Sequence, residues 1–257
     1  MLELKIPGLA GKAFLVTGAS TGIGAAVAIA LAGQGASVGV HFHTSEVDAR
    51  RVADHITSQG GTAFLVSGDM ANHDSVGAVV ENTATHFRRL DGLINNAGDM
   101  LGRVPTEDSS ETHDREVVDL NSLSVVWACR AAIPWMKREG GVIINTSSIA
   151  ARHGGGGGAV LYAAAKGFVS TFTKGFAKEV IKYGVRVNAV SPGVIKTRFH
   201  ERHSNEEQMK AMVATVPMGR AGTPDDCVGT YLFLASDVMS GYVTGQTIEV
   251  NGGQFMI

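Results

Sequence analysis

Tyr162 and Lys166 are the residues of this 257-residue chain whose types and spacing point most directly to chemistry. They stand four positions apart, which places both side chains on one face of a helix. The three alanines between them allow a sheet or a ligand to approach closely. A phenol has a pKa of about 10, and a neighbouring ammonium group stabilises the phenolate and lowers that pKa. Such a pair can exchange a proton with a reacting oxygen at neutral pH; the alternative is a surface pair without a role.

A serine precedes this pair at the end of an apolar segment. Ser148 lies 14 residues before Tyr162, with the glycine run 154–158 between them. We favour Ser148 over the adjacent Ser147 because the context Ser-Ile-Ala-Ala begins with it. Its hydroxyl can donate a hydrogen bond to a carbonyl oxygen, and that bond strengthens as negative charge builds there. The glycine run is either a flexible surface turn or a loop that borders the site.

A glycine-rich segment near the N-terminus has the features of a phosphate-binding loop. Gly18, Gly22 and Gly24 follow an apolar segment and open a helix of small residues. Glycines allow the tight turn and the close approach of backbone to a pyrophosphate. The N-terminus of the helix adds free N–H groups and partial positive charge. The strand before and the helix after make a dinucleotide site the better interpretation than a simple turn.

Apolar segments and helical patterns alternate along the chain and predict the framework that holds these groups. We expect strands at 13–16, 37–42, 62–66, 93–94, 142–144 and 185–190, and helices at 23–32, 47–56, 72–87, 111–137 and 160–182. Continuous apolar strands separated by helices are typical of a parallel sheet covered on both faces. The fold class we predict is α/β: a single-domain, Rossmann-type, doubly wound parallel sheet over residues 1–257.

Composition narrows the function classes. The 22 basic and 24 acidic residues give a formal charge of −2, which disfavours a nucleic-acid partner. Cys129 and Cys227 form neither a metal spacing nor a disulfide framework, and the nine histidines show no metal triad, so we expect no metal site. We see no signal peptide and no membrane-spanning segment. These features predict a soluble cytoplasmic protein.

Over essentially its whole length the chain resembles the short-chain dehydrogenase/reductase family. The resemblance is carried by Thr-Gly-x-x-x-Gly-Ile-Gly (17–24), Asn-Asn-Ala-Gly (95–98), Tyr-x-x-x-Lys (162–166) and Ser-Pro-Gly (191–193). It implies an NAD(P)-dependent oxidoreductase, with Asn121 as the active-site asparagine and Lys166 on the nicotinamide ribose. It also implies assembly as a homotetramer. The implied cofactor contacts are Gly18, Ser20, Thr21, Gly22, Ile23, Gly24, His43, Thr44, Asp69, Met70, Asn95, Ala97, Gly98, Tyr162, Lys166, Pro192, Gly193, Ile195 and Thr197.

The end of the second predicted strand bears on the choice of cofactor. An NAD-preferring site carries a carboxylate there for the ribose 2′-hydroxyl. Here no acidic residue occurs before Glu46, whereas His43, Thr44 and Ser45 can donate hydrogen bonds to a 2′-phosphate. NADP(H) is therefore favoured and NAD(H) is possible. The family's usual basic residue in the glycine loop is replaced by Thr21, so the alternative is a loose preference.

The substrate is a small molecule, and its contacts are expected from two variable segments. Arg103 follows the fourth strand, and Arg198 and Arg202 lie in a predicted substrate lid near 197–215. These arginines either clamp an anionic group or belong to a solvated loop. The segments around them resemble those of keto-sugar uronate reductases, and the general pattern equally resembles 3-oxoacyl carrier-protein reductases. A nucleotide-sensing Rossmann protein is the non-enzymatic alternative.

Overall fold

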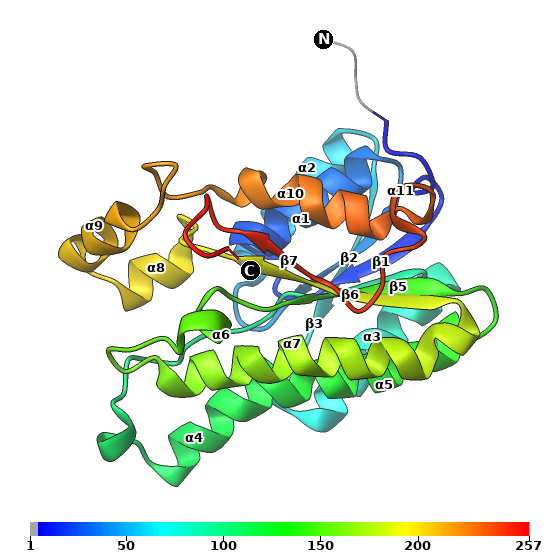
Figure 1. Cartoon of the computed structure of the whole chain (residues 1–257). Coiled ribbons are helices and arrows are strands. Elements are labelled where there is room, and N and C mark those ends of the chain that lie inside the picture. The colour runs from blue at the N-terminus through cyan, green and yellow to red at the C-terminus, as the bar shows by residue number, and fades with distance from the viewer. Residues whose placement is uncertain (1–4, 257) are drawn as a thin grey trace.

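A computed structural model describes residues 5–256 of the chain. Its centre is one parallel sheet with the strand order β3-β2-β1-β4-β5-β6-β7. The strands are β1 (Ala13–Val16), β2 (Ser37–Phe42), β3 (Thr62–Ser67), β4 (Gly92–Asn95), β5 (Gly141–Thr146), β6 (Val185–Pro192) and β7 (Thr247–Val250). The predicted fold class is confirmed: the sheet is doubly wound and has helices on both faces (Figure 1).

Two helical layers enclose the sheet. One layer consists of α1 (Gly22–Gly33), α2 (Glu46–Ser58), α10 (Pro224–Ala235) and α11 (Asp237–Ser240); the other consists of α3 (His73–Phe87), α4 (Glu111–Val118), α5 (Ser124–Met136) and α7 (Val160–Val180) (Figure 1). Alternate residues of a strand supply the two cores, because successive side chains point to opposite faces. Phe14 and Val16 pack toward α1 and α10, and Leu15 packs toward α3 and α5.

Three short helices follow the carboxyl ends of strands. They are α6 (Ala150–His153) after β5, and α8 (Arg198–His203) and α9 (Glu206–Ala214) after β6. Helices α8 and α9 extend beyond the two layers at one end of the molecule (Figure 1). In a parallel sheet all carboxyl ends meet at one edge, and the strand order reverses between β1 and β4. Such a switch point opens a crevice for a ligand.

The expected helix over 111–137 is wrong in detail, because it is divided. Helix α4 ends at Val118, the π-helical segment Asp119–Leu123 follows, and α5 begins at Ser124. Asn121 explains part of the interruption, because its side-chain Nδ2 donates to the carbonyl of Val117 at 2.9 Å. In a regular α-helix this carbonyl would accept from the backbone N–H of Asn121. The π-helical segment thus coincides with a predicted site residue.

Other differences lie at element ends. The helix expected over 160–182 ends at Val180 and continues as the 3₁₀ turn Ile181–Tyr183. Strand β7 and helices α10 and α11 have no counterpart among the predicted elements. Asn72 is the N-cap of α3 as expected, since its side chain accepts from the N–H of Ser75. No helix within residues 5–256 is both long enough and apolar enough to cross a membrane.

Candidate active site

A cavity of about 1150 Å³ opens at the carboxyl edge of the sheet. It is larger than the ~300–1,000 Å³ of most small-ligand pockets, as a site for a dinucleotide and a substrate requires. Its lining contains most of the predicted site residues, namely Gly18, Ser20, Thr21, Gly22, Ile23, His43, Thr44, Asp69, Met70, Ala97, Gly98, Arg103, Ser148, Tyr162, Lys166, Pro192, Gly193, Ile195, Thr197, Arg198 and Arg202. Gly24, Asn95 and Asn121 lie behind this lining.

The glycine loop is shaped by close backbone contacts. A Cβ atom on Gly18 would lie 3.0 Å from the Cα of Ala97, and Gly18 has a φ of +62° that favours glycine. A Cβ on Gly24 would lie 2.3 Å from the carbonyl oxygen of Gly18, so Gly24 serves the turn itself. Asn96 completes the turn, since its Nδ2 donates to the carbonyls of Thr17 and Gly18 at 3.0 and 3.1 Å.

His41 fixes the other side of this loop. The N–H of Gly18 donates to His41 Nδ1 at 3.0 Å, and His41 Nε2 lies 3.1 Å from the carbonyl of Gly68. The first bond requires Nδ1 to be unprotonated, so Nε2 carries the hydrogen and donates. Burial lowers the pKa of His41 from 6.5 to about 4, which keeps the ring neutral. The ring thereby joins the glycine loop to the loop that begins with Asp69.

The contacts of His41 were not foreseen from the sequence. A polar residue inside the apolar strand Ser37–Phe42 was the available signal, because buried polar groups require partners. Asn95 is likewise a structural residue: it is buried in β4 and donates to Asn145 Oδ1 at 2.9 Å.

Tyr162 and Lys166 face the cavity from the first turns of α7. The Lys166 side chain is buried, its Nζ donates to the carbonyl of Thr146 at 3.0 Å, and Nζ lies 5.7 Å from the centre of the Tyr162 ring. Burial lowers the pKa of Lys166 from 10.5 to about 8. The ammonium form still predominates at neutral pH.

The pKa of Tyr162 differs from the expectation. Desolvation in the cavity raises it from 10 to about 12; a hydrogen bond with Ser148 lowers it, and the negative charge of Asp99 raises it further. The net pKa of Tyr162 therefore lies above its ordinary value, and the stabilisation of the phenolate by Lys166 stays a prediction. The physical reason is that burial of the phenol outweighs the available stabilisation.

The two candidate serines have different surroundings. Ser147 lies within hydrogen-bonding distance of the carbonyl of Lys166, at 3.0 Å, and of Ser170 Oγ, at 2.7 Å, so its hydroxyl is used in packing α7 onto β5. Ser148 contacts Tyr162 and its hydroxyl accepts from the N–H of Ala150 at 3.1 Å. Ser148 is therefore the serine placed beside the phenol, as its sequence context predicted.

Asn121 lies behind Gly98, next to Lys166. Its Oδ1 is buried and has no hydrogen-bond partner. A Cβ on Gly98 would lie 2.7 Å from this oxygen and 3.0 Å from Lys166 Nζ, so a glycine at this position lets both groups reach the same point. An orphaned buried acceptor costs free energy unless a water or a ligand pairs with it. The arrangement is suited to hold a water between Asn121 and Lys166.

The three predicted substrate arginines do not converge on one point. Arg103 Nε donates to the carbonyl of His203 at 2.5 Å, Arg202 pairs with Asp99 at 2.7 Å, and Arg198 pairs with Asp48 of α2 at 2.5 Å. Each guanidinium already has a protein partner although all three arginines line the cavity, so binding of an anion by them stays a prediction. The contacts join residues 100–150 positions apart, which sequence spacing does not reveal.

The glycine run borders the cavity. Gly155 and Gly156 line it, and all five glycines of the run 154–158 have positive φ values. A Cβ on Gly158 would lie 2.7 Å from the carbonyl carbon of Arg103, and Arg103 Nη1 donates to the carbonyl of Gly157 at 3.1 Å. Of the two alternatives for this run, a loop beside the site is the correct one.

At the expected ribose end of the cavity, His43 and Thr44 are exposed and line the wall. The nearest downstream carboxylate, that of Glu46, accepts from Arg50 at 2.8 Å on the surface of α2. No carboxylate from Ser37–Glu46 lies in the lining of the cavity, which agrees with the sequence.

Comparisons with known proteins cover nearly the whole chain. A family model described as Enoyl-(Acyl carrier protein) reductase matches residues 18–254. A 3-oxoacyl-[acyl-carrier-protein] reductase of Synechocystis sp. (strain ATCC 27184 / PCC 6803 / Kazusa) is 41% identical, with 96% of this chain and 98% of the relative covered.

Two solved structures show the same fold. An NADH-dependent reductase A1-R′ responsible for alginate metabolism has a TM-score of 0.88 at 35% identity, covering 97% of this chain and 99% of that one. A short-chain dehydrogenase from Burkholderia cenocepacia J2315 in complex with NADP has a TM-score of 0.89 at 30% identity, covering 96% and 98%. The similarity therefore extends to proteins described with either cofactor.

Proposed function

The chain belongs to the short-chain dehydrogenase/reductase family of NAD(P)-dependent oxidoreductases, and from this premise we propose that it interconverts a carbonyl and an alcohol with Tyr162 as general acid and base. The observation that carries the proposal is the placement of Ser148, Tyr162 and Lys166 in one cavity with the glycine loop. Asn121 stands directly behind them. A nucleotide-sensing protein, the non-enzymatic alternative, has no need of this complete set.

The cavity fits a nicotinamide dinucleotide. Gly18 and Gly22 leave space beside Ala97 and Thr197 that side chains would fill, and the glycine loop precedes the N-terminus of α1, where backbone N–H groups attract phosphate. Asp69 and Met70 form the wall expected beside the adenine, and Pro192, Gly193 and Thr197 the wall expected beside the nicotinamide. When bound, the dinucleotide supplies or accepts the hydride of the reaction.

The side chains of the chain then handle the oxygen and its proton. Ser148 donates a hydrogen bond to the substrate oxygen, and Tyr162 gives that oxygen a proton during reduction. The Lys166 ammonium stabilises the phenolate left behind and holds the ribose hydroxyls. Its position beside the unpaired Oδ1 of Asn121 supports a bound water through which Tyr162 regains its proton.

We propose NADP(H) as the preferred cofactor. The support is the absence of a carboxylate from the described cavity wall at the end of β2, together with the exposed donors His43 and Thr44. A 2′-phosphate carries negative charge that a carboxylate at this point would repel. NAD(H) binding remains compatible with the same wall.

We propose a small anionic keto-sugar, of uronate type, as the favoured substrate. Arg103, Arg202, His153 and His200 line the cavity together with the carboxylates of Asp99 and Glu116. The guanidinium and imidazole groups supply hydrogen-bond donors for an anionic substrate group. The segment 197–215, which contains α8 and α9, acts as the lid of this single-domain enzyme. The second candidate, a 3-oxoacyl carrier-protein reductase, is favoured by the name of the relative that is 41% identical.

A homotetramer is the proposed assembly. Helix α7 carries the stacked rings of Phe168, Phe172 and Phe176, and Phe168 is 42% exposed on its outer face. Phe172 and Phe176 are partly buried against the core, so the exposed end of the row at Phe168 is the part suited to pack against a second copy. Sedimentation velocity of the wild-type protein and of Phe168→Glu tests this: a tetramer should give way to smaller species in the variant.

Substrate and cofactor are tested together by NADPH consumption. The purified protein is given a keto-uronate or a short 3-oxoacyl thioester, and each reaction is repeated with NADH. Turnover of the uronate alone, faster with NADPH, is the expected result. Turnover of the thioester alone moves the assignment to the second candidate, and faster turnover with NADH overturns the cofactor preference.

A further inference from the structure

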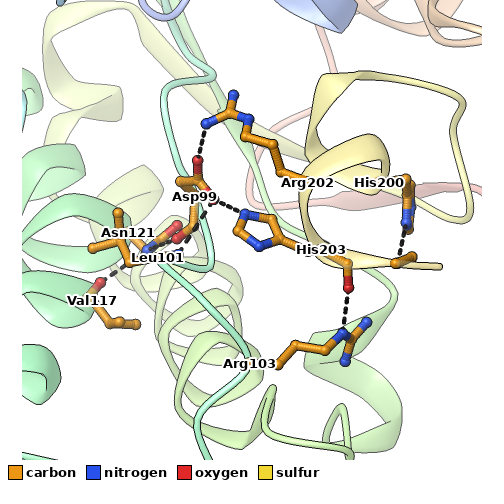
Figure 2. A network of polar contacts seen from close by, with 9 residues as sticks. Asp99, Leu101, Arg103, Val117, Asn121, His200, Arg202 and His203 are labelled. Carbon is orange, nitrogen blue, oxygen red and sulfur yellow. Dashed lines mark hydrogen bonds and ion pairs between the residues drawn. The ribbon is translucent and has the colours of Figure 1, made fainter.

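Helix α8 of the lid is docked against the active site through its last turn. His203 Nε2 donates to Asp99 Oδ1, and Arg202 Nη1 donates to Asp99 Oδ2 at 2.7 Å (Figure 2). On the same helix the ring of Phe199 lies 5.4 Å from the ring of Tyr162 and 5.1 Å from that of His203. One carboxylate therefore receives two side-chain contacts from the last turn of a helix whose Phe199 also touches the proposed acid.

Arg103 reinforces this docking from the backbone side. Its Nε donates to the carbonyl of His203, the last residue of α8 (Figure 2). Its Nη1 donates to the carbonyl of Gly157 in the glycine run. Asp99 and Arg103 both lie in the loop after β4, so this loop holds α8 at two points. The side chains of Asp99 and His203 are only 17% and 10% exposed, which shields their contact from water.

The backbone of Asp99 has a separate partner on the opposite side. Asn121 Nδ2 donates to the carbonyl of Asp99 at 2.7 Å and to that of Val117 at 2.9 Å (Figure 2). Its Oδ1 has no hydrogen-bond partner and lies, like Lys166 Nζ, within 3.0 Å of the point that a Cβ on Gly98 would occupy. A shift of the Asp99 backbone would move one of the two acceptors that orient the Asn121 amide. Asp99 thus stands between the lid and the proposed water site.

Asp99 also acts on Tyr162 through its charge. Lys166 from α7 and Asp99 from the loop after β4 act on the phenol, and His203 and Arg202 of α8 lie behind Asp99. The other charged or titratable residues of the cavity that contains Tyr162 are Arg103, Glu116, Arg198, His153 and His200, with His41, His43 and Asp69 on the cofactor side. The negative charge of Asp99 raises the pKa of Tyr162 and so opposes phenolate formation. Arg202 offsets that charge when α8 is docked.

We propose that Asp99 is a positioning residue that couples docking of the lid to the proton-transfer groups. Its carboxylate captures Arg202 and His203, its carbonyl holds the amide of Asn121, and capture neutralises the negative charge that faces Tyr162. The enzyme thereby completes its acid–base site as the lid closes over a substrate. This inference rests on the proposed function of Tyr162 and adds a residue outside the predicted set.

Two substitutions separate this role from a merely structural one. Both Asp99→Asn and Arg202→Gln weaken the docking of α8, but they change the charge near Tyr162 in opposite directions. Alcohol oxidation needs the phenolate, so its rate rises with pH. That rise should move to lower pH by roughly 1 unit in D99N and to higher pH by roughly 1 unit in R202Q. Each variant should also lose about tenfold in kcat.

Asp48→Asn is the matched control. Arg198, at the other end of α8, pairs with Asp48 of α2, so D48N removes an ion pair of the same helix without touching Asp99. Its pH profile should match that of the wild-type protein. Shifts of D99N and R202Q in the same direction, or an equal shift in D48N, would overturn the proposal.

Hydrogen–deuterium exchange supplies a readout that requires no turnover. With D99N, the amides of the segment 119–123 should exchange faster than in the wild-type protein, together with those of α8; with D48N, only α8 should change. Unchanged exchange over 119–123 in D99N would contradict the coupling. A wild-type protein without turnover would instead contradict the proposed function and leave the exchange result interpretable.

Discussion

The cofactor side and the substrate side of the cavity are each anchored by a histidine, but in opposite ways. His41 lies inside β2, is 1% exposed, and uses both ring nitrogens on backbone groups of two loops. His203 lies on the lid and uses its ring on the side chain of Asp99. The first contact joins parts of one sheet edge, whereas the second joins a short helix to that edge.

This difference indicates how the two sides work. Buried hydrogen bonds to backbone are costly to break, so the glycine loop is held in one shape before any ligand arrives. The lid is held by side-chain pairs, several of them exposed, such as Arg198 with Asp48, and exposed ion pairs contribute little. We expect substitutions on the cofactor side to change affinity and stability, and those on the lid to change rate and pH dependence.

Among the substitutions that compare the cofactor side with the substrate side, the largest loss of activity is expected at Lys166, where the two sides meet. Lys166→Met should lower kcat about 10²–10³-fold, because the phenolate and the ribose lose the ammonium group. In the wild-type protein, carbonyl reduction should decline as pH rises through about 8, where burial places the pKa of Lys166. Steady-state rates from pH 6 to 10 test both statements. Lys166→Arg, which stays charged, should not show this decline; the same decline in that variant would contradict the assignment.

The next effect concerns the free energy of unfolding. The pKa of His41 is about 4 in the folded protein and 6.5 without burial, so between these pH values the unfolded chain binds a proton that the folded chain does not. The contribution of His41 is full above pH 6.5 and falls by roughly 3 kcal/mol as pH decreases to 4. The charge of nearby His43 lowers the pKa of His41, and the charge of Asp69 raises it.

Urea unfolding at pH 7 and at pH 4.5 measures this loss. His41→Asn is the comparison, because an asparagine does not titrate and should lack this part of the pH dependence. An identical pH dependence in the variant and the wild-type protein would show that His41 is not held neutral by the fold.

A smaller effect is expected on cofactor affinity. His41→Leu leaves the N–H of Gly18 without its acceptor and should raise the Kd for NADPH about tenfold, which corresponds to roughly 1.4 kcal/mol. In His41→Asn, Oδ1 can take the place of Nδ1, and the Kd should remain within about twofold of the wild-type value. Fluorescence titration with NADPH tests this without turnover. Equal weakening in both variants would place the role of His41 in packing and not in the hydrogen bond to Gly18.

The smallest effect is expected at the outer end of the lid. Asp48→Asn removes the exposed pair with Arg198 and should leave the Tm and the Kd for NADPH unchanged within error. Differential scanning fluorimetry and the same titration provide the measurement. A marked loss of NADPH affinity would show that the lid also holds the cofactor, and the two sides would then not be separable.

The sequence predicted those parts of the fold and site that depend on local pattern. Gly18, Gly22 and the Tyr162–Lys166 pair were found because a turn and a helical spacing fix their relative positions within a few residues. Strands buried on both faces were visible as apolar runs for the same reason. The roles argued for His41 and Asp99 were missed, since their partners come from other loops: Gly18 and Gly68 for the first, the lid and Asn121 for the second.

The expectations from sequence that the structure did not bear out involve contacts or burial that local sequence patterns do not report. The three arginines were expected either to clamp an anion or to lie in a solvated loop, but each meets an acceptor 54–150 residues away in the chain. The π-helical segment at Asn121 escaped notice because apolar periodicity does not report a side chain that competes for a backbone carbonyl. The raised pKa of Tyr162 depends on burial, which spacing alone does not show.

Tyr162→Phe tests the central claim most directly. The substitution removes the hydroxyl and keeps the ring that packs beside Phe199. We predict that kcat for NADPH-dependent reduction falls about 10³-fold or more, while the Kd for NADPH, measured by fluorescence on the same sample, stays within about twofold. Reduction at an unchanged rate by the variant would show that Tyr162 is not the acid, and the proposed mechanism would then be wrong.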